Sequence, residues 1–521
     1  MHTAKLYVET TGNGSNENFY IDSCSLKKVI THEQYLRDNV PPYWSDGGLE
    51  DCLAVINAYN ASLVSVRPQS SEKVLLNPYK GLNYYTTKFD LTNLDFTKQG
   101  IQNAKVVYHR LSWKQLEPVE GKYEFDVIKN NIKTLAQHGK MLGIGIGSCI
   151  TYNGFNNKTN AQNTPDWFFA NYKAAYTEHI DGNGTPANSN EYSKADGTQY
   201  LKVPVYNDPI FKEKMQNFLS AFAEEFNGDP NIAFVDMRVY GNWGEWHCTS
   251  LGLGKGVVRP HSREVRQRYA DMYLKNFKKT PIIFMTDDHE TLEYALGDGE
   301  KPRVGMRRDG VGSPGHFKRW IGTFPYEKIT RMGDVWKDMP MFFEFFASVN
   351  RMRGWGWDIP YSLKWVLKNH ASLVNEGPLG PDQIAEGSSE EKLLRDIDLY
   401  AGARLVPEKA RVECGDGVIK VRVEGTNKGV SKIYLPYEFV YELRDRAGNV
   451  VAEKISAKNP GAILPGKFVL SDEFKADLKD GETYFLSLRV RHIQKVFKDF
   501  RFASKNLTKD GSLDLGNIKI K

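Results

Sequence analysis

Apolar and polar positions follow two different periods along the middle and the end of this chain of 521 residues. From about residue 74 short apolar runs recur, most of them separated by stretches with apolar residues at helical spacing. The runs that predict strands are VLLNPYKGLNYY, AKVVYHRLSW, MLGIGIGSC, IAFVDMRVYG, PIIFMTDD, RVGMRRDG, PMFFEFF and ASLVNEG. Strands that alternate with helices in this way predict an α/β chain with a (β/α)₈ TIM barrel, over residues 76–385.

The pattern changes after the predicted barrel. Residues 386–521 contain strictly alternating strands separated by DG, AGN and KDG turns, with few helical stretches between them. This texture is typical of an antiparallel β-sandwich. Residues 1–29 read as two strands joined by a Gly/Asn/Ser turn, and residues 30–75 read as a mixed connector.

Composition excludes several classes of function. The chain has 69 Lys and Arg against 64 Asp and Glu, a formal net charge of +5, and the basic residues are scattered, so we expect no nucleic-acid partner. Its five cysteines are widely spaced and form no CxxC or Cys/His pattern, so we expect neither a disulfide framework nor a structural zinc. We also expect no metal and no other cofactor. No apolar run is long enough to span a membrane, and the start lacks the pattern of a signal peptide.

Two glutamates interrupt apolar strand-like runs. Glu245 follows the fourth predicted strand in GNWGEWH, and Glu344 closes the seventh in MPMFFEFF. Burying a carboxylate without a partner costs several kcal/mol, so each needs a reason. Barrel enzymes carry their working groups at the C-terminal ends of the strands, where both glutamates are expected. Glu376, which closes the eighth strand in LVNEG, is the main rival of Glu344.

A pair of carboxyl groups at one barrel mouth is the machinery of retaining glycoside hydrolysis, in which one group protonates the leaving oxygen and the other attacks the anomeric carbon. We expect Tyr240, Trp243 and Trp246 to surround Glu245 with apolar surface and raise its pKa. Glu344 must stay ionised, and Arg308, Arg307 or Arg110 could keep it so through charge and hydrogen bonds. The competing interpretations are a turn-capping Glu245 and a buried structural salt bridge for Glu344.

Further candidates for substrate binding lie near the predicted strand ends. Each has a structural alternative: a helix cap for the aspartates, an internal ion network for the arginines, and core packing for the tryptophans. The candidates are Arg110, Trp113, Asn242, Trp243, Trp246, Asp287, Asp288, Arg307, Arg308, Trp355 and Trp357.

Longer phrases resemble known families. The stretch RLSWKQLEPVEGKYEFDVIKNNIKTLAQHGKMLGIGI is similar to the second-strand and third-strand region of clan A glycoside hydrolases, among them family 42 β-galactosidases. GNWGEWH, RRDG and GARLV resemble more closely a group of barrel proteins, assigned as glycoside hydrolases, with a WGEW motif and a C-terminal β-sandwich. The resemblance implies that Glu245 is the acid/base and Glu344 the nucleophile. Gly244 stands where many clan A enzymes have an Asn, for which Asn242 is a candidate substitute.

The phrase FYIDSCSL near the start resembles the last hairpin of jelly-roll carbohydrate-binding modules, so residues 1–29 are expected to be the remnant of such a module. Together these features predict a retaining hydrolase that cleaves β-glycosidic bonds of plant-type polysaccharides or oligosaccharides, either β-galactosidase-like or a hemicellulase. The partner is then a carbohydrate, and we expect a secreted or cell-surface protein on the basis of that substrate. The alternatives are a non-catalytic glycan-binding protein on a barrel scaffold and a structural surface module.

Overall fold

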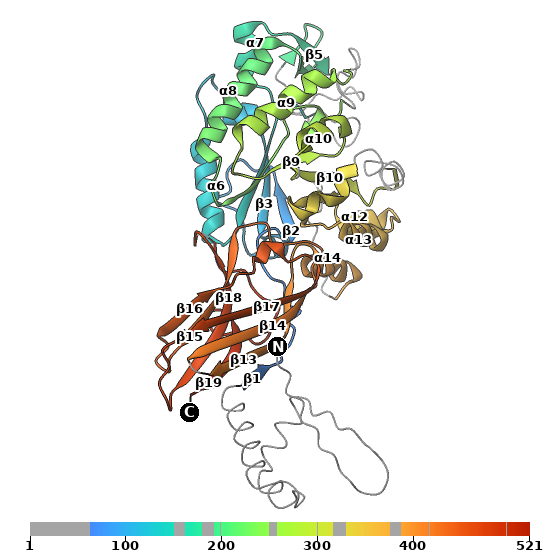
Figure 1. The fold of residues 1–521 in the computed structure, drawn as a ribbon. Helices are drawn as coiled ribbons and strands as arrows, with labels where there is room; N and C mark the ends of the chain where they lie inside the picture. Colours follow the sequence, from blue (N-terminus) through green and yellow to red (C-terminus); the bar gives the residue numbers. More distant parts are fainter. Residues whose placement is uncertain are drawn as a thin grey trace, which may run out of the picture.

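The computed structural model describes residues 63–150, 162–179, 192–197, 199–248, 258–299, 301–315, 330–375, 387–415, 417–495 and 497–520. The described chain forms a barrel wrapped by helices and, at one end of it, a sandwich of strands (Figure 1). The predicted hairpin at 1–29 and the rival Glu376 lie outside the described residues.

Eight parallel strands close into a barrel, which confirms the predicted TIM fold. In barrel order these strands are β2 (Gly81–Thr86), β3 (Val106–Ser112), β4 (Met141–Gly147), β8 (Ile232–Asp236), β9 (Ile282–Met285), β10 (Gly305–Val311), β11 (Met341–Phe345) and β12 (Leu373–Asn375). Glu344 therefore lies on the seventh barrel strand, and the GNWGEWH segment follows the fourth, as the sequence predicts.

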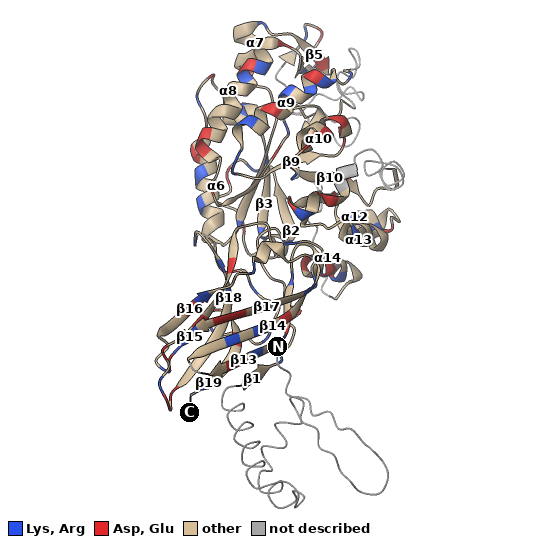
Figure 2. Ribbon diagram, in the orientation of Figure 1, with Lys and Arg blue, Asp and Glu red and all other residues tan. Residues whose placement is uncertain are grey.

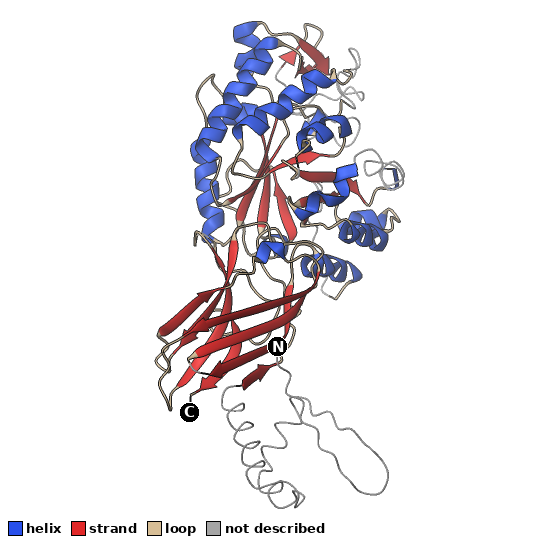
Figure 3. Ribbon diagram, in the orientation of Figure 1, coloured by secondary structure: helices blue, strands red, loops and turns tan. Residues whose placement is uncertain are grey.

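Helices cover the outside of the barrel (Figure 3). Helix α8 (Pro209–Phe226) shows why they form: the side chain of Asp208 accepts hydrogen bonds from the first-turn amides, Pro209 occupies the first turn, and Phe211, Phe218 and Phe222 bury one face. The other α-helices are α4 (Gln99–Gln102), α5 (Trp113–Leu116), α6 (Phe125–Gln137), α7 (Asp166–Tyr172), α9 (Arg263–Asn276), α10 (His289–Leu296), α12 (Val349–Gly354), α13 (Ile359–Lys368) and α14 (Ser389–Tyr400).

Smaller elements decorate the connections. The segment after β4 carries a small antiparallel sheet of three strands, and short 3₁₀ turns follow β8 and precede β11. These elements are β5 (Tyr176–His179), β6 (Tyr192–Ser193), β7 (Gln199–Pro204), η1 (Asn242–Gly244), η2 (Thr330–Lys337) and, in the tail, η3 (Pro460–Ala462).

The interior of the barrel changes character along its strands. Tyr108, Phe234 and Phe342 fill the lower interior, with the ring of Tyr108 5.2 Å from that of Phe342. Two positions further along the same three strands stand Arg110, Asp236 and Glu344. Because side chains two apart on a strand share a face, these charged groups stack directly on the aromatic layer, toward the C-terminal ends of the strands.

Two four-stranded antiparallel sheets form the tail sandwich, as predicted. Alternating residues of both sheets enclose one apolar core. One sheet has the order β1 (Leu63–Val66), β13 (Leu405–Gly415), β14 (Val418–Asn427) and β17 (Gly466–Lys475); the other has β16 (Val450–Ile455), β15 (Tyr437–Arg444), β18 (Thr483–His492) and β19 (Leu513–Lys519). Residues 63–66, within the predicted connector, thus supply an edge strand of the sandwich.

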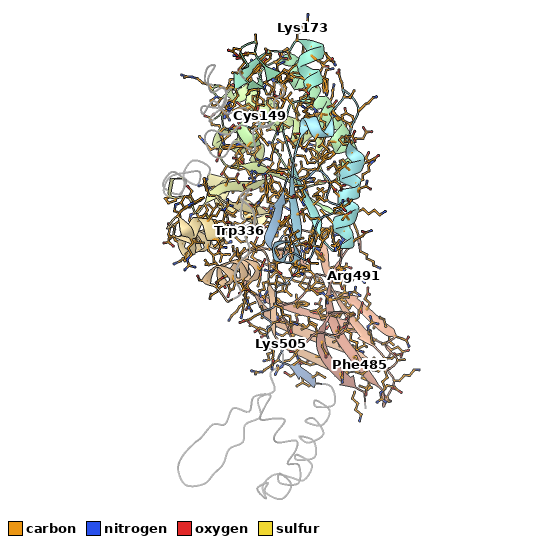
Figure 4. The ribbon with its side chains drawn as sticks, turned by 180° about the vertical axis from the view of Figure 1, so that it is seen from behind. Cys149, Lys173, Trp336, Phe485, Arg491 and Lys505 are labelled. Carbon is orange, nitrogen blue, oxygen red and sulfur yellow. The ribbon has the colours of Figure 1, made fainter. Side chains whose placement is uncertain are left out.

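Barrel and sandwich meet through specific polar contacts. The hydroxyl of Tyr434 donates to the carbonyl of Trp336 at 2.7 Å, and the indole of Trp336 stacks on His370 at 3.8 Å. Figure 4 shows Trp336 on the barrel side of this junction and Phe485 and Arg491 on the sandwich. Helix α14 lies before the sandwich in the chain and packs on the barrel, where Asp398 accepts from the backbone amide of Leu82 at 2.9 Å.

Acidic and basic residues are interspersed over the outer helices and sheets (Figure 2). This distribution agrees with the small net charge of the whole chain. Within the described ranges, every helix is too short or too polar to span a lipid bilayer.

Candidate active site

Seven charged side chains converge at the C-terminal mouth of the barrel, and together they are named the charged cluster. They come from β3, from β8 and the segment after it, from β10 and from β11, and ion pairs of 3.9 Å or less link them. Its members are Arg110, Asp236, Arg238, Glu245, Arg307, Asp309 and Glu344.

Glu344 lies deepest among the candidate catalytic carboxylates, with 4% of its side chain exposed. Its Oε2 accepts hydrogen bonds from Arg110 at 2.6 Å, from Arg307 at 3.0 Å and from the amide of Asn375 at 3.1 Å. Burial alone would raise the pKa of Glu344, but the charges of Arg110 and Arg307 outweigh it and lower the pKa. The expectation that an arginine keeps this carboxylate ionised is confirmed for these two residues.

Glu245 faces Glu344 from the segment after β8. Its Oε1 lies 3.1 Å from Arg238 and 3.7 Å from Arg110, and its Oε2 lies 3.6 Å from Nε2 of His247. One carboxylate oxygen of Glu245 and one of Glu344 are within 4.8 Å of each other. The two glutamates singled out from the sequence therefore share one site.

The segment that carries Glu245 has an unusual backbone. Gly241, Trp243, Gly244 and Trp246 all have positive φ, between 53° and 83°. This region costs a non-glycine residue free energy and is concentrated at functional sites. A Cβ on Gly244 would lie 2.1 Å from the carbonyl oxygen of Arg238. No Asn fits at that position without a rearrangement of the segment, which explains the departure from the clan pattern.

The expected raised pKa of Glu245 is wrong. Burial does act in that direction, but the contact with His247 and the charges of Arg238, Arg307 and Arg110 prevail and lower the pKa well below its usual range. Two of the three aromatic residues expected around the carboxyl, Tyr240 and Trp246, are buried in the packed wall behind it.

Asp309 is the third carboxyl at the mouth. Its Oδ2 accepts from Arg307 at 2.6 Å, and one of its oxygens lies within 4.8 Å of those of Glu245 and Glu344. Burial raises the pKa of Asp309 well above its ordinary value; Arg307 opposes this shift, and the negative charges of Glu344 and Glu245 add to it.

Asp236 and Arg238 complete the cluster, and sequence reasoning missed both. Asp236 accepts from the hydroxyl of Tyr108 and lies 3.1 Å from Arg238 and 3.5 Å from Arg307. The signal was present: each is a charged residue in the apolar run IAFVDMRVY. A charged residue within an apolar strand needs a partner, at these two positions as at the two glutamates.

His247 and Asp287 form an outer layer above Glu245. Burial lowers the pKa of His247, but the contact with Glu245 outweighs this effect, and the net shift is upward. Burial raises the pKa of Asp287 to about 6, against the effect of His247. The indole of Trp243 meets the ring of His247 edge-on at 5.4 Å, so this tryptophan also borders the site.

Several predicted substrate contacts lie elsewhere. Trp113 and Trp246 are in the core, where their indole groups donate to Glu117 at 2.6 Å and to the carbonyl of Met237 at 2.7 Å. Asp288 caps α10 by accepting from the backbone amide and hydroxyl of Thr291 at 3.1 and 2.6 Å.

The remaining candidates are nearer the site. The side-chain oxygen of Asn242 accepts from the amide of Trp243 at 3.0 Å and holds the strained segment. Arg308 is buried, and its charge opposes the rise in the pKa of Asp287 that burial causes. After β11, Trp355 is half exposed, and its ring lies 5.0 Å from that of Trp357, which contacts Phe346 two residues beyond Glu344. This pair offers an apolar surface on the segment that follows the strand of Glu344.

The carboxylates of Glu245, Asp309 and Glu344 have the spacing of a metal site. Arg307, however, already donates to Oδ2 of Asp309 and Oε2 of Glu344, and Arg110 donates to Oε2 of Glu344 as well. Guanidinium groups at these distances repel a cation, so the donor set does not fit a metal ion.

Comparison with known proteins agrees with this geometry. A sequence model of the Glyco_hydro_42 family, described as β-galactosidase, matches residues 86–247. Over this segment, which is less than half of the chain, the protein is similar to family 42 glycoside hydrolases. The matched segment runs from the end of β2 to His247 and therefore contains Arg110, Asp236, Arg238 and Glu245 of this glycoside hydrolase. No curated protein matches the chain.

Among solved structures, the barrel is similar to a β-amylase catalytic domain from Paenibacillus polymyxa, with 8% identity, a TM-score of 0.40, and coverage of 62% of this chain and 98% of that chain. A β-galactosidase from Halorubrum lacusprofundi has 12% identity and a TM-score of 0.34, with 62% and 57% covered. A β-galactosidase from Marinomonas ef1 has 12% identity and a TM-score of 0.33, with 61% and 58% covered.

Proposed function

We propose that this glycoside hydrolase is a retaining β-glycosidase in which Glu344 is the nucleophile and Glu245 the acid/base. The observation that carries the proposal is the approach of their carboxylate oxygens to within 4.8 Å at the mouth of the barrel. Retaining enzymes hold the two carboxyl groups about 5 to 5.5 Å apart, whereas inverting enzymes leave room for a water, at about 6.5 to 9.5 Å.

The surroundings of Glu344 suit a nucleophile. Arg110, Arg307 and Asn375 all donate to Oε2, which keeps the carboxylate ionised and fixes its rotamer. The other oxygen, Oε1, is then the atom that attacks the anomeric carbon. As the covalent ester forms, the carboxylate loses its charge, so the same arginines favour the return of the carboxylate when water cleaves the ester.

Glu245 lies on the opposite side of the gap and accompanies the leaving oxygen. In the first step it gives that oxygen a proton as the C–O bond breaks, and in the second it takes a proton from the attacking water. Its lowered pKa suits the second task. Protonation of the leaving oxygen requires that a neighbouring group supply Glu245 with a proton.

The substrate that we propose is a β-linked galactoside or a hemicellulose-type oligosaccharide or polysaccharide. Sugar rings stack on aromatic side chains, and Trp243, Trp355 and Trp357 are the aromatic groups that we propose for this contact. A substrate of this kind is met outside the cell, and on that basis we propose a secreted or cell-surface location.

A panel of chromogenic β-glycosides and plant polysaccharides, assayed with the wild type, Glu245→Gln and Glu344→Gln, tests the proposal. We expect turnover of at least one β-linked substrate, the β-anomer as the first product by NMR, and loss of turnover in both variants with the fold intact by circular dichroism. An α-anomer as the first product contradicts the retaining mechanism. Tight glycan binding without turnover identifies a binding protein instead.

A further inference from the structure

The charged cluster holds one carboxyl more than its arginines can balance. Among the described residues, three guanidinium groups face four carboxyl groups, which would give a formal charge of −1 if all were ionised. Like charges that crowd together in a buried site do not all ionise, and one proton is retained and shared. The site therefore holds a proton near neutral pH, and its acceptors are the four carboxyl groups and His247, whose Nε2 lies 3.6 Å from Glu245.

Three of the four carboxyl groups are poor places for that proton. Glu344 accepts three hydrogen bonds on one oxygen. Glu245 is paired with Arg238 and lies against His247. Asp236 accepts from the hydroxyl of Tyr108 and from Arg238. Donors that point at a carboxylate stabilise its ionised form.

Asp309 differs from these three. Arg307 is its hydrogen-bond donor, on Oδ2, and Arg110 approaches only to 3.9 Å. Its buried Oδ1, like that of Asp236, has no hydrogen-bond partner in the described ranges. The two residues differ at Oδ2, which accepts from both Tyr108 and Arg238 in Asp236 but from Arg307 alone in Asp309. A buried polar atom without a partner is costly, and a carboxyl group that accepts few hydrogen bonds gains least from being ionised.

The backbone of β10 directs this side chain into the site. The pairing of β10 with β11 shifts register between Arg308 and Val311, and Gly310 in that interval has a φ of 68°. Such a β-bulge re-aims a side chain and is frequent beside active sites. Arg307 and Asp309, two positions apart on β10, both reach the charged cluster.

We propose that Asp309 is a positioning residue that holds the proton which Glu245 delivers to the leaving group. This inference deepens the proposed retaining mechanism and rests on it. The oxygens of the two residues lie within 4.8 Å, a gap that one water or one sugar hydroxyl spans by two hydrogen bonds.

The steps balance. In the first, the proton of Asp309 passes through the bridging group to Glu245 and on to the glycosidic oxygen. The electron pair of the breaking C–O bond stays on that oxygen, and Oε1 of Glu344 forms the ester with the anomeric carbon. In the second, water attacks that carbon and the ester bond breaks. The proton released by the water returns through Glu245 to Asp309, and the carboxylate of Glu344 regains its charge.

Other titratable groups around Asp309 set its environment. They come from β2, β3, β8 and the segment after it, β9, β10 and β11, and are Tyr85, Tyr108, Arg110, Asp236, Arg238, Glu245, His247, Asp287, Arg307, Arg308 and Glu344.

Infrared spectroscopy of the resting protein with ¹³C-labelled aspartate tests where the proton lies, without any need for activity. The C=O band of a protonated aspartate at pH 7 should be present in the wild type and lost in Asp309→Asn. Asp271→Asn, which removes a surface carboxyl on α9, should retain the band. Asp398, with a pKa raised to about 7 by burial, contributes a separate band to every spectrum. Identical spectra of the wild type and Asp309→Asn would overturn the proposal.

The dependence on the leaving group tests the role of that proton. Asp309→Asn should lower kcat/KM for an alkyl β-glycoside at least about tenfold more than for a dinitrophenyl β-glycoside, which needs no acid. Asp309→Glu should restore part of the loss. Equal losses for both substrates would overturn the role. If the wild type cleaves no glycoside, the proposed function fails, while the infrared result still decides where the proton lies.

Discussion

In the sandwich, Arg491 forms its own ion pairs with Glu438 at 2.7 Å and Glu453 at 3.0 Å, and these two carboxylates are 19% and 39% exposed. At the barrel mouth, Arg110 and Arg307 share one buried oxygen of Glu344, at 2.6 and 3.0 Å. Ion pairs whose carboxylates are reached by water contribute little to stability. A shared and unbalanced set of buried charges is costly to assemble. The molecule therefore carries its costly electrostatics at the proposed catalytic site and not in the sandwich.

The largest expected effect is a loss of activity from a substitution at the barrel mouth. Glu344→Gln removes the proposed nucleophile but keeps its shape, so kcat should fall by at least roughly 10⁴-fold. Steady-state kinetics on the best chromogenic β-glycoside measure this change. A fall of less than tenfold, in a variant whose circular dichroism matches the wild type, would remove Glu344 from the mechanism.

Glu245→Gln should have a smaller effect that depends on the substrate. General acid catalysis contributes about 10²- to 10⁴-fold, so kcat/KM should fall within that range for an alkyl glycoside and much less for a dinitrophenyl glycoside. Added azide should accelerate the reaction of this variant with the dinitrophenyl glycoside and yield a β-glycosyl azide, because azide, unlike water, attacks the ester without a general base. Without that product, the assignment of Glu245 as acid/base fails.

The stability of the protein should depend on pH through Asp309 at the barrel mouth. The pKa of Asp309 is raised in the folded state, so between its unfolded pKa of about 4 and its folded pKa the folded protein binds one proton more than the unfolded chain. Rising pH therefore costs the wild type about 1.4 kcal/mol per pH unit through this group, a cost that Asp309→Asn lacks.

Melting temperatures at pH 4 and pH 8 test this expectation. Asp309→Asn should gain stability relative to the wild type as the pH rises, and should be the more stable protein at pH 8. Parallel melting curves for the two proteins across this range would show that Asp309 titrates normally.

The smallest effect is expected in the sandwich. Arg491→Met removes two partly exposed ion pairs, so it should lower the free energy of unfolding by about 1 kcal/mol or less and leave kcat unchanged. Urea denaturation and steady-state kinetics check both parts. A large loss of kcat would mean that the sandwich takes part in catalysis.

The barrel was predictable because its signals are local. Apolar runs at regular spacing gave eight strands, and the rule that strand ends carry chemistry brought Glu245 and Glu344 together in advance. The sandwich was predictable from its alternating apolar and polar residues. Its edge strand Leu63–Val66 was not, because its partner β13 follows in the chain only after the whole barrel sequence.

The electrostatics of the site were not predictable from neighbours in the sequence. The aromatic residues beside Glu245 suggested a raised pKa, whereas Arg110 and Arg307, far away along the chain, determine the opposite shift. Similarly, nothing local to Asp287 and Asp288 says which one caps a helix and which one faces the site. Such facts depend on the register of distant strands.

Covalent trapping tests the central claim most directly. A 2-deoxy-2-fluoro-β-glycosyl fluoride of the preferred sugar slows the second step more than the first, so the ester intermediate accumulates, and peptide mass spectrometry locates the attached sugar. We predict one fluorosugar per chain, on Glu344. A label on Glu376 or on Glu245, or continued turnover with no label, would contradict the account.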